Sequence, residues 1–220
     1  MAKPAILTTD QQGFLQLIAN EPSLTYQFYL TGGTALAGFY IPYRLSEDLD
    51  FFSDKEVDHT EIQAFIKANQ AKLCYTKLEI SQSFNRNLVF LDLPAGQLKL
   101  EFTYFPFPQA EPPMAVDGLR VDSLLDIALN KIFTIYQKPR SRDYMDLYMI
   151  LKQEHWLIDD LIAKAKIKFD WHIDPLQLGS QFLRVTEIKD LPKLIQPLNN
   201  KDWQGFFLAE AKKMGAEVTS

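Results

Sequence analysis

Two aspartates carry the most specific chemical signal in this sequence. Asp48 and Asp50 lie two residues apart beside the apolar run 49–52, which is typical of a β-strand. Side chains two apart on a strand share one face of the sheet. Two carboxylates held side by side repel each other unless a cation lies between them, and a divalent metal suits that position. The pair therefore predicts a metal site, and the plainer alternative is a solvated Asp-x-Asp at the end of a strand.

A pair of glycines precedes the aspartates. Gly32 and Gly33 follow the apolar segment 26–30, which we expect to be a buried strand, and Thr34 can cap a helix that runs to about Tyr40. Glycines let a backbone turn sharply and let phosphates approach its N–H groups, and the start of a helix adds partial positive charge. Together with the carboxylates, this turn predicts nucleotidyl or phosphoryl transfer.

Composition limits the class of protein. The chain has 220 residues, of which 47% are hydrophobic, so it is globular and can form one large domain or two small ones. A net charge of −5 argues against a protein that coats nucleic acid through bulk charge, although basic residues cluster locally at 138–142. No apolar run is long enough to span a bilayer, no signal peptide is recognisable, and the single cysteine excludes an internal disulfide. These features predict a cytoplasmic location without a membrane partner.

The chain changes character near residue 113. Before it, helical periodicity at 8–20 and from 58 onward is mixed with strand-like runs at 73–80, 87–93 and 97–104, the last two forming a hairpin. A proline-rich stretch at 106–113 marks a boundary. Beyond it we expect only helices, at 121–136, 142–152, 158–166, 174–185 and 203–212. The pattern predicts an α+β protein with a mixed α/β domain at 1–113 and a helical domain at 114–220.

Three motifs, in this order, resemble the AbiEii/AbiGii nucleotidyltransferase toxins of the polymerase-β-like nucleotidyltransferase superfamily, and the resemblance spans about residues 26–151. They are Thr31-Gly32-Gly33-Thr34-Ala35-Leu36, then Arg44 and Ser46 before Asp48-Leu49-Asp50-Phe51-Phe52, and Lys131 followed by Arg142-Asp143-Tyr144-Met145-Asp146-Leu147. The resemblance implies a nucleotidyltransferase fold with a mixed sheet and flanking helices, followed by a helical domain that closes over the nucleotide.

The resemblance also implies roles for acidic residues. Asp48 and Asp50 would hold Mg²⁺, with Mn²⁺ as the alternative metal, and the ion would bridge the nucleotide phosphates. Superfamily members place another carboxylate on a neighbouring strand, and Glu101 has that setting. The alternative for Glu101 is an exposed glutamate that pairs with Lys99.

In the helical half, the resemblance makes Lys131 a ligand of the triphosphate. It makes Asp146 a base, or a group that orients the acceptor hydroxyl. A lysine on an apolar helix face needs a partner. An interhelical ion pair between Lys131 and Asp146 without a chemical role therefore explains the same pattern.

Gly32, Gly33 and Thr34 would bind the nucleotide. By the same resemblance Arg44 would contact phosphate, and Ser46 would position its loop or accept a transferred group. The plain alternative is that Ser46 caps a turn.

Gly38 and Pro42 depart from the family pattern, and they put in doubt the end of the helix after the Gly pair and the aim of Arg44.

The implied reaction transfers a nucleoside monophosphate from an NTP to an acceptor hydroxyl. By family analogy the acceptor is a tRNA end, and the protein is a toxin restrained by an antitoxin in a toxin–antitoxin or phage-defence system. Two alternatives stay open: transfer to a protein or small molecule, and a non-catalytic protein that binds nucleotide or a partner.

Overall fold

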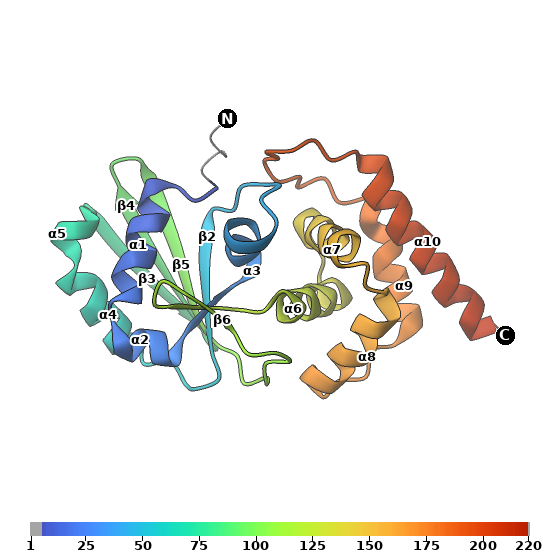
Figure 1. The fold of residues 1–220 in the computed structure, drawn as a ribbon, viewed down its shortest axis with the longest axis horizontal. Coiled ribbons are helices and arrows are strands. Elements are labelled where there is room, and N and C mark those ends of the chain that lie inside the picture. The colour runs from blue at the N-terminus through green and yellow to red at the C-terminus, as the bar shows by residue number, and fades with distance from the viewer. Residues whose placement is uncertain (1–5, 220) are drawn as a thin grey trace. The chain divides into compact units, whose positions relative to one another are not determined.

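The computed structural model describes residues 6–219, and Figure 1 traces their path. These residues form two compact units, each with its own buried core. Unit 1 comprises the chain up to Tyr40, Leu45–Pro108 and Pro112–Ser123, and unit 2 comprises Ile41–Arg44, Gln109–Glu111 and the chain from Leu124.

Within the described residues, unit 1 is built on a seven-stranded mixed sheet. Its elements are α1 (Thr9–Ala19), α2 (Pro22–Gln27), β1 (Tyr29–Thr31), α3 (Gly32–Ala35), the π-helix η1 (Leu36–Tyr40), β2 (Asp48–Ser53), α4 (His59–Ala68), α5 (Gln70–Leu73), β3 (Lys77–Ser83), β4 (Arg86–Leu93), β5 (Gly96–Tyr104), β6 (Met114–Val116) and β7 (Leu119–Val121). The strand order is β3-β4-β5-β2-β1-β7-β6, with β2/β5 and β1/β7 parallel and the other neighbours antiparallel. The predicted mixed sheet with flanking helices is confirmed, as is the hairpin of β4 and β5.

One face of the sheet carries the core of unit 1. Alternation along β2 and β5 turns Phe51 and Phe102 to this face, where their ring centroids stack 5.1 Å apart. Phe14 of α1 contacts Phe51 at 6.1 Å, and Phe28 meets Phe102 edge-on at 5.1 Å. Figure 1 shows α1, α2, α4 and α5 grouped together beside the sheet. The burial of these aromatic rings fixes which face of β2 is left for polar side chains.

Two predicted strands begin later than expected. The strand predicted at 26–30 begins at Tyr29, because Tyr26 and Gln27 belong to α2, whose first turn Pro22 favours and whose Leu24 is buried. Residues 70–73 form α5, which ends at Cys74 in the left-handed conformation, so β3 starts only at Lys77. Strand propensity was overridden by turn geometry at both places.

The end of unit 1 lies beyond the proline-rich stretch. Two short strands that the sequence did not reveal, β6 and β7, turn at Asp117 and Gly118, both with positive φ. Leu30 of β1 pairs with Val121 of β7, and the N–H of Asp122 donates to the Leu30 carbonyl at 2.8 Å. This pairing extends unit 1 to Ser123, ten residues past the predicted division between 113 and 114.

The helix after the Gly pair has an irregular second half. It starts at Gly32 rather than at Thr34, and from Leu36 to Tyr40 it continues as a π-helix. A Cβ on Gly38 would approach Leu7 to 3.2 Å, so this turn lies close to the N-terminal segment. π-Helical turns are rare and occur frequently at functional sites. The doubt that the sequence raised about this turn therefore corresponds to a real irregularity.

Unit 2 is helical over its described residues. Its elements are α6 (Leu124–Gln137), α7 (Ser141–Glu154), α8 (Ile158–Phe169), α9 (Pro175–Leu183), the 3₁₀-helix η2 (Arg184–Thr186) and α10 (Asn200–Thr219). Phe207 of α10 packs against Tyr144 at 5.0 Å and Phe182 at 5.1 Å, and Trp203 is fully buried. None of the described helices is long and apolar enough to cross a bilayer.

A buried carboxylate ties the proline-rich stretch to unit 2. The Asp126 oxygens accept the backbone N–H groups of Ala110 at 2.8 Å and Glu111 at 3.0 Å. Lys168, also buried, contacts Asp126 at 2.6 Å. Because the carboxylate is paired with Lys168 and hydrogen-bonded to two backbone N–H groups, the cost of its burial is offset.

We predict that Phe102→Ala will lower the free energy of unfolding by about 3–5 kcal/mol, because it removes a ring buried between Phe51 and Phe28. Urea denaturation followed by circular dichroism measures this. The matched control is Phe84→Ala in the β3–β4 turn, where the ring is fully exposed and the cost should stay below about 0.5 kcal/mol. Equal losses in the two variants would contradict the described core.

Candidate functional site

The predicted carboxylate pair lies on one face of β2. Burial alternates along this strand, with Leu49 and Phe51 buried and Asp48 and Asp50 half-buried on the other face. The parallel register with β5 places Asp48 opposite Lys99 and Asp50 opposite Glu101. Four charged side chains are thus gathered on two adjacent strands.

Two of the predicted metal ligands, Asp48 and Glu101, each have a basic partner. Lys99 Nζ lies 2.7 Å from Asp48 Oδ2. Glu101 does not pair with Lys99, as one sequence interpretation held. It is buried, and it accepts hydrogen bonds from Arg86 Nε at 2.7 Å and from Arg86 Nη2 at 2.5 Å. The hydrogen bond to Glu101 and the charge of that carboxylate raise the pKa of Arg86. Thr103 adds a hydrogen bond of 2.8 Å to Glu101.

The Gly32 turn makes close contact with Asp50. Gly32 has φ +70°, and a Cβ at this position would lie 2.5 Å from Asp50 Oδ2. Only glycine accommodates both this conformation and this approach. The carboxylate of Asp50 therefore lies directly against the backbone at the start of α3.

Hydrogen bonds also hold the loop before β2. Thr34, predicted to bind nucleotide, is buried and donates its hydroxyl to the backbone carbonyl of Asp48. Gln11 of α1 is buried and its amide donates to the carbonyls of Ser46 at 2.9 Å and Glu47 at 3.2 Å. Ser46 is half-buried in this loop. Hydrogen bonds from Thr34 and Gln11 thus fix the backbone of residues 46–48.

Asp48 and Asp50 form a donor set that fits one divalent cation. Mg²⁺ in nucleotide-processing sites is bound by one or two carboxylates, and phosphate and water oxygens complete its shell. The ion pair of Asp48 with the ammonium group of Lys99 shows that a cation is favoured at this carboxylate. Among residues 6–219 no group of three or more His, Cys, Asp or Glu side chains is arranged to hold a metal. A role for Glu101 as a third ligand would require its pair with Arg86 to open.

The remaining predicted residues form a buried ionic network in unit 2. Asp146 of α7 accepts Arg44 Nε at 2.6 Å and the second Arg44 nitrogen at 2.7 Å, one on each carboxylate oxygen. Tyr43 donates its hydroxyl to Asp146 at 2.6 Å. Lys131 of α6 lies 2.6 Å from Asp146 and 2.8 Å from Asp143. The interhelical ion pair that the sequence left open as an alternative is present.

Charge and burial set the protonation of this network. Burial disfavours the ionised form of Asp146, but the charges of Lys131 and Arg44 outweigh it and hold the pKa of this carboxyl well below its ordinary value. Burial and the adjacent carboxylate raise the pKa of Tyr43, so its hydroxyl stays a donor. Asp146 has no exposed surface here, and it would reach an acceptor hydroxyl only if its partners moved.

Arg44 differs from its predicted setting. The chain around it belongs to unit 2, where Arg44 bridges to Leu194 and the Tyr43 carbonyl accepts the N–H of Ile195 at 2.8 Å. Its guanidinium is 2% exposed and is bound to Asp146. Contact with a phosphate would require that pair to separate, because the fork of a guanidinium fits one carboxylate at a time on this edge.

The structure thus groups the predicted site residues in two sets. The first, in unit 1, is Gly32, Gly33, Thr34, Ser46, Asp48, Asp50 and Glu101; the second, in unit 2, is Arg44, Lys131 and Asp146.

Sequence reasoning missed Arg86, Tyr43 and Gln11. Arg86 could have been predicted from the sequence, because the register of the predicted β4–β5 hairpin places Arg86 opposite Thr103, on the face of Glu101. Tyr43 and Gln11 had no such signal, since their partners are distant in the chain.

Comparison with known proteins supports the motifs. A family model described as the nucleotidyl transferase AbiEii toxin of a type IV toxin–antitoxin system matches residues 14–220. The uncharacterized protein aq_aa25 of Aquifex aeolicus (strain VF5) is 30% identical over 147 residues, which are 64% of this chain and 66% of that protein. The match therefore spans slightly less than two thirds of the relative's length.

Two crystal structures from Helicobacter pylori share the fold. JHP933 has a TM-score of 0.60 and 22% identity, over 96% of this chain and 90% of that one. A candidate nucleotidyltransferase has a TM-score of 0.59 and 20% identity, over 100% of this chain and 98% of that one. At this identity the likeness concerns the fold, which is that of a nucleotidyltransferase, as the motifs predicted.

We predict that Gly32→Ala will lower the free energy of unfolding by about 1–3 kcal/mol, because alanine is strained at positive φ and its Cβ meets Asp50. Thermal and urea unfolding measure the loss. Gly13→Ala is the control: this site in α1 has no neighbour within 4 Å, and the change should stabilise the helix by about 0.5–1 kcal/mol. A Gly32→Ala protein as stable as wild type would contradict the close approach.

We predict that Asp146→Asn will cost about 3–5 kcal/mol at neutral pH, because it leaves buried cations without their anion. The pKa of Asp146 is lower in the folded than in the unfolded chain, so its contribution is complete above the unfolded value of about 3.9 and is lost as the pH falls toward the folded value. The stability difference from wild type should therefore shrink between about pH 5 and pH 2.

Urea denaturation across this pH range tests it. Asp54→Asn, at an exposed aspartate, should differ little from wild type at any of these pH values. A difference for Asp146→Asn that does not change with pH would count against the ionised network.

Proposed function

Because the chain belongs to the nucleotidyl transferase AbiEii toxin family, we propose that it transfers a nucleoside monophosphate from an NTP to an acceptor hydroxyl and releases pyrophosphate. The observation that carries this proposal is the pair Asp48 and Asp50 on one face of β2, with Asp50 against the Gly32 turn. A carboxylate pair and a glycine turn in contact provide for metal and phosphate at one place.

Unit 1 provides the residues for the reacting phosphate. Asp48 and Asp50 would hold Mg²⁺, or Mn²⁺, which supplies charge neutralisation for the triphosphate when bound. The backbone at Gly32 and Gly33 would face the phosphate oxygens. Lys99, now on Asp48, would be released toward the phosphates or the solvent as the cation binds. In this proposal the metal ion replaces the ammonium group of Lys99 as the cation bound to Asp48.

Unit 2 provides the second predicted set. Lys131 would bind the triphosphate, and Asp146 would act as base or orient the acceptor. Their burial favours a positioning role for Asp146, which holds Lys131 and Arg44 at fixed places. Lys131 keeps some exposed surface, at 7%, whereas Asp146 has none. A lysine can turn an ammonium proton toward phosphate while it keeps a carboxylate partner.

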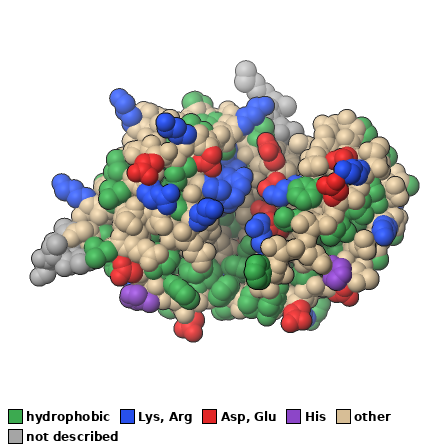
Figure 2. All heavy atoms as spheres, turned by 180° about the vertical axis from the view of Figure 1, so that it is seen from behind, with side chains coloured by type: hydrophobic (Ala, Val, Ile, Leu, Met, Phe, Trp, Pro, Cys, Tyr) green, Lys and Arg blue, Asp and Glu red, His purple; other side chains and the backbone are tan. Residues whose placement is uncertain are grey.

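The acceptor and the biological role rest on the family. The proposed acceptor is the hydroxyl end of a tRNA, and the proposed partner is an antitoxin protein that restrains a toxin. Figure 2 shows Lys, Arg, Asp and Glu side chains interspersed on one face, and the net charge is −5. Such a surface offers local contacts to RNA rather than a broad positive field.

The test incubates the purified protein with each labelled NTP, Mg²⁺ and total tRNA, and follows the label on gels. We expect transfer by wild type and a loss of at least about 100-fold in Asp48→Asn and Asp50→Asn. Asp54→Asn, just beyond the same strand, is the control and should keep full activity. Removal of the metal with EDTA should stop transfer in every sample.

The results also separate the alternatives. Undiminished transfer after Asp48→Asn would exclude the proposed site. Label on protein but not on RNA, read by mass spectrometry, would favour a protein acceptor. Tight binding of Mg²⁺-NTP by calorimetry, with no transfer to RNA, protein or small molecules, would favour a non-catalytic binding protein.

A further inference from the structure

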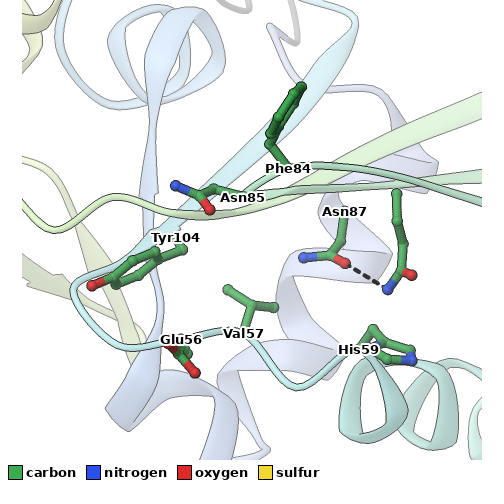
Figure 3. Close-up of a pocket in the computed structure, with 8 residues that line it drawn as sticks. Glu56, Val57, His59, Phe84, Asn85, Asn87 and Tyr104 are labelled. Carbon is green, nitrogen blue, oxygen red and sulfur yellow. Dashed lines mark hydrogen bonds between the residues drawn. The ribbon is translucent and has the colours of Figure 1, made fainter.

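A cavity of about 330 Å³ opens in unit 1 where β5 ends and the β3–β4 hairpin turns (Figure 3). This hairpin cavity is also lined by the loop after β2 and by the first turn of α4. Its volume is in the range of small-ligand sites. None of the residues that line it takes part in the proposed transfer step.

The tip of the hairpin has an unusual residue. Ser83 pairs with Arg86, so Phe84 and Asn85 alone form the turn. Two-residue hairpin turns need positive φ and favour Asn and Gly, yet Phe84 takes φ +51°. Its ring is fully exposed and buries nothing against the protein. A bulky residue that is strained and exposed at the rim of a cavity is placed to contact a ligand.

Beneath the tip, the cavity has a rigid wall. Gln82 donates to the amide oxygen of Asn87 at 3.1 Å, the bond drawn in Figure 3, and the Asn87 nitrogen donates to the Phe102 carbonyl at 3.2 Å. The N–H of Tyr104 donates to the carbonyl of Asn85 at 2.9 Å. These bonds fix the amide of Asn87 and hold the backbone of the hairpin tip to the end of β5.

Other polar groups in the cavity are available to a ligand. Within the described residues, the side chains of Asn85, Tyr104 and His59 make no hydrogen bond to the protein. All three line the cavity (Figure 3). They provide an amide with donor and acceptor atoms, a phenol and an imidazole.

The lining suits a planar, uncharged ligand with a polar edge. The described residues around the cavity include neither Lys nor Arg, and Glu56 adds a carboxylate, so a phosphate is disfavoured. Aromatic rings such as Phe84 and Tyr104 stack on nucleobases, and amides such as Asn85 pair with base edges. Both features of a nucleobase have a counterpart here.

The cavity lies toward the end of β2 and β5 that follows the carboxylate pair, but on the other face of the sheet: Tyr104 shares the face of Phe102, and Asp48 and Asp50 are on the opposite face. Tyr104 is opposite Ser53 in the register of β2 with β5, and Ser53 is three residues beyond Asp50. At about 3.3 Å per residue, the cavity begins about 10 Å along β2 from the carboxylates. A single-stranded nucleic acid held in the cavity would reach the carboxylates by passing around the ends of β2 and β5 over its next few nucleotides.

We propose that the hairpin cavity binds a nucleobase of the acceptor RNA, with Phe84 stacked on the base and Asn85 paired with its edge. The assignment to the acceptor rests on the proposed function, whereas base binding itself does not depend on transfer. The contact would hold the RNA strand at the end of the sheet, around which the strand would pass to bring its terminal hydroxyl to the carboxylates on the other face.

The test measures binding without catalysis, and without metal or NTP. Short fluorescein-labelled single-stranded RNA oligomers are titrated with the full chain and followed by anisotropy. Phe84→Ala should weaken binding about 10- to 100-fold, and Asn85→Ala should weaken it less and change the order of preference among the four homopolymers. Ile167→Ala, at a strongly exposed apolar residue of α8, is the matched control and should bind as wild type.

A second measurement identifies the source of the base. Side-chain amide signals of Asn85 and Gln82 are followed by NMR as AMP, CMP, GMP or UMP is added. Shifts with mononucleotides as well as oligomers show that the cavity recognises the base itself, and shifts with oligomers alone show that it needs a strand. Both results support the proposal.

Three outcomes overturn it. The first is that Phe84→Ala and Asn85→Ala bind RNA within twofold of wild type. The second is that RNA oligomers shift NMR signals of other residues but not those of Asn85 and Gln82. The third is that Phe84→Ala leaves RNA affinity unchanged but loses binding to a protein partner. The last would make the tip a protein contact. Asp48→Asn separates the two proposals: it should abolish transfer and leave RNA affinity unchanged. Base binding lost in Phe84→Ala without transfer by wild type would refute the proposed function alone.

Discussion

The parallel pairing of β2 with β5 is the constraint on which the arrangement in unit 1 depends. It sets Asp48 opposite Lys99, with which it forms an ion pair, and Asp50 opposite Glu101, a second carboxylate. A shift of one residue would turn the aspartates into the core and Leu49 and Phe51 out of it. Burial of aromatic rings on one face therefore fixes the position of the carboxylates on the other.

In unit 2, the arrangement depends on a buried charge, the carboxylate of Asp146. Asp146 loses its hydration completely, which is tolerated only because Arg44, Lys131 and Tyr43 satisfy both of its oxygens. The network joins two helices to a segment that precedes β2 in the chain. Because that segment leads directly into Asp48, the carboxylate pair begins a few residues after an anchored arginine. The structural anchor and the proposed metal ligands are therefore adjacent in the chain.

Local pattern was enough for much of the fold and for the centre of the site. Alternation along 48–53 placed Asp48 and Asp50 on one face, and the turn at 94–96 defined the β4–β5 hairpin. Both depend on residues close in sequence, where the period of a strand is decisive. The order of the motifs pointed to the family, whose model covers residues 14–220. The strands β6 and β7 were not predicted, because such short segments have weak propensity and the pairing of β7 with β1 decides their structure.

The sequence by itself thus determined which strand presents the two predicted metal ligands, and on which common face, because side-chain type and a period of two are local properties. Only the tertiary structure decided their partners: Arg86 for Glu101, Lys99 for Asp48, and Arg44 for Asp146. It also decided that Gly32 touches Asp50 and that Phe84 stands over a cavity. Each of these contacts joins segments separated along the chain, and burial and hydrogen bonding across the sheet or between helices select them.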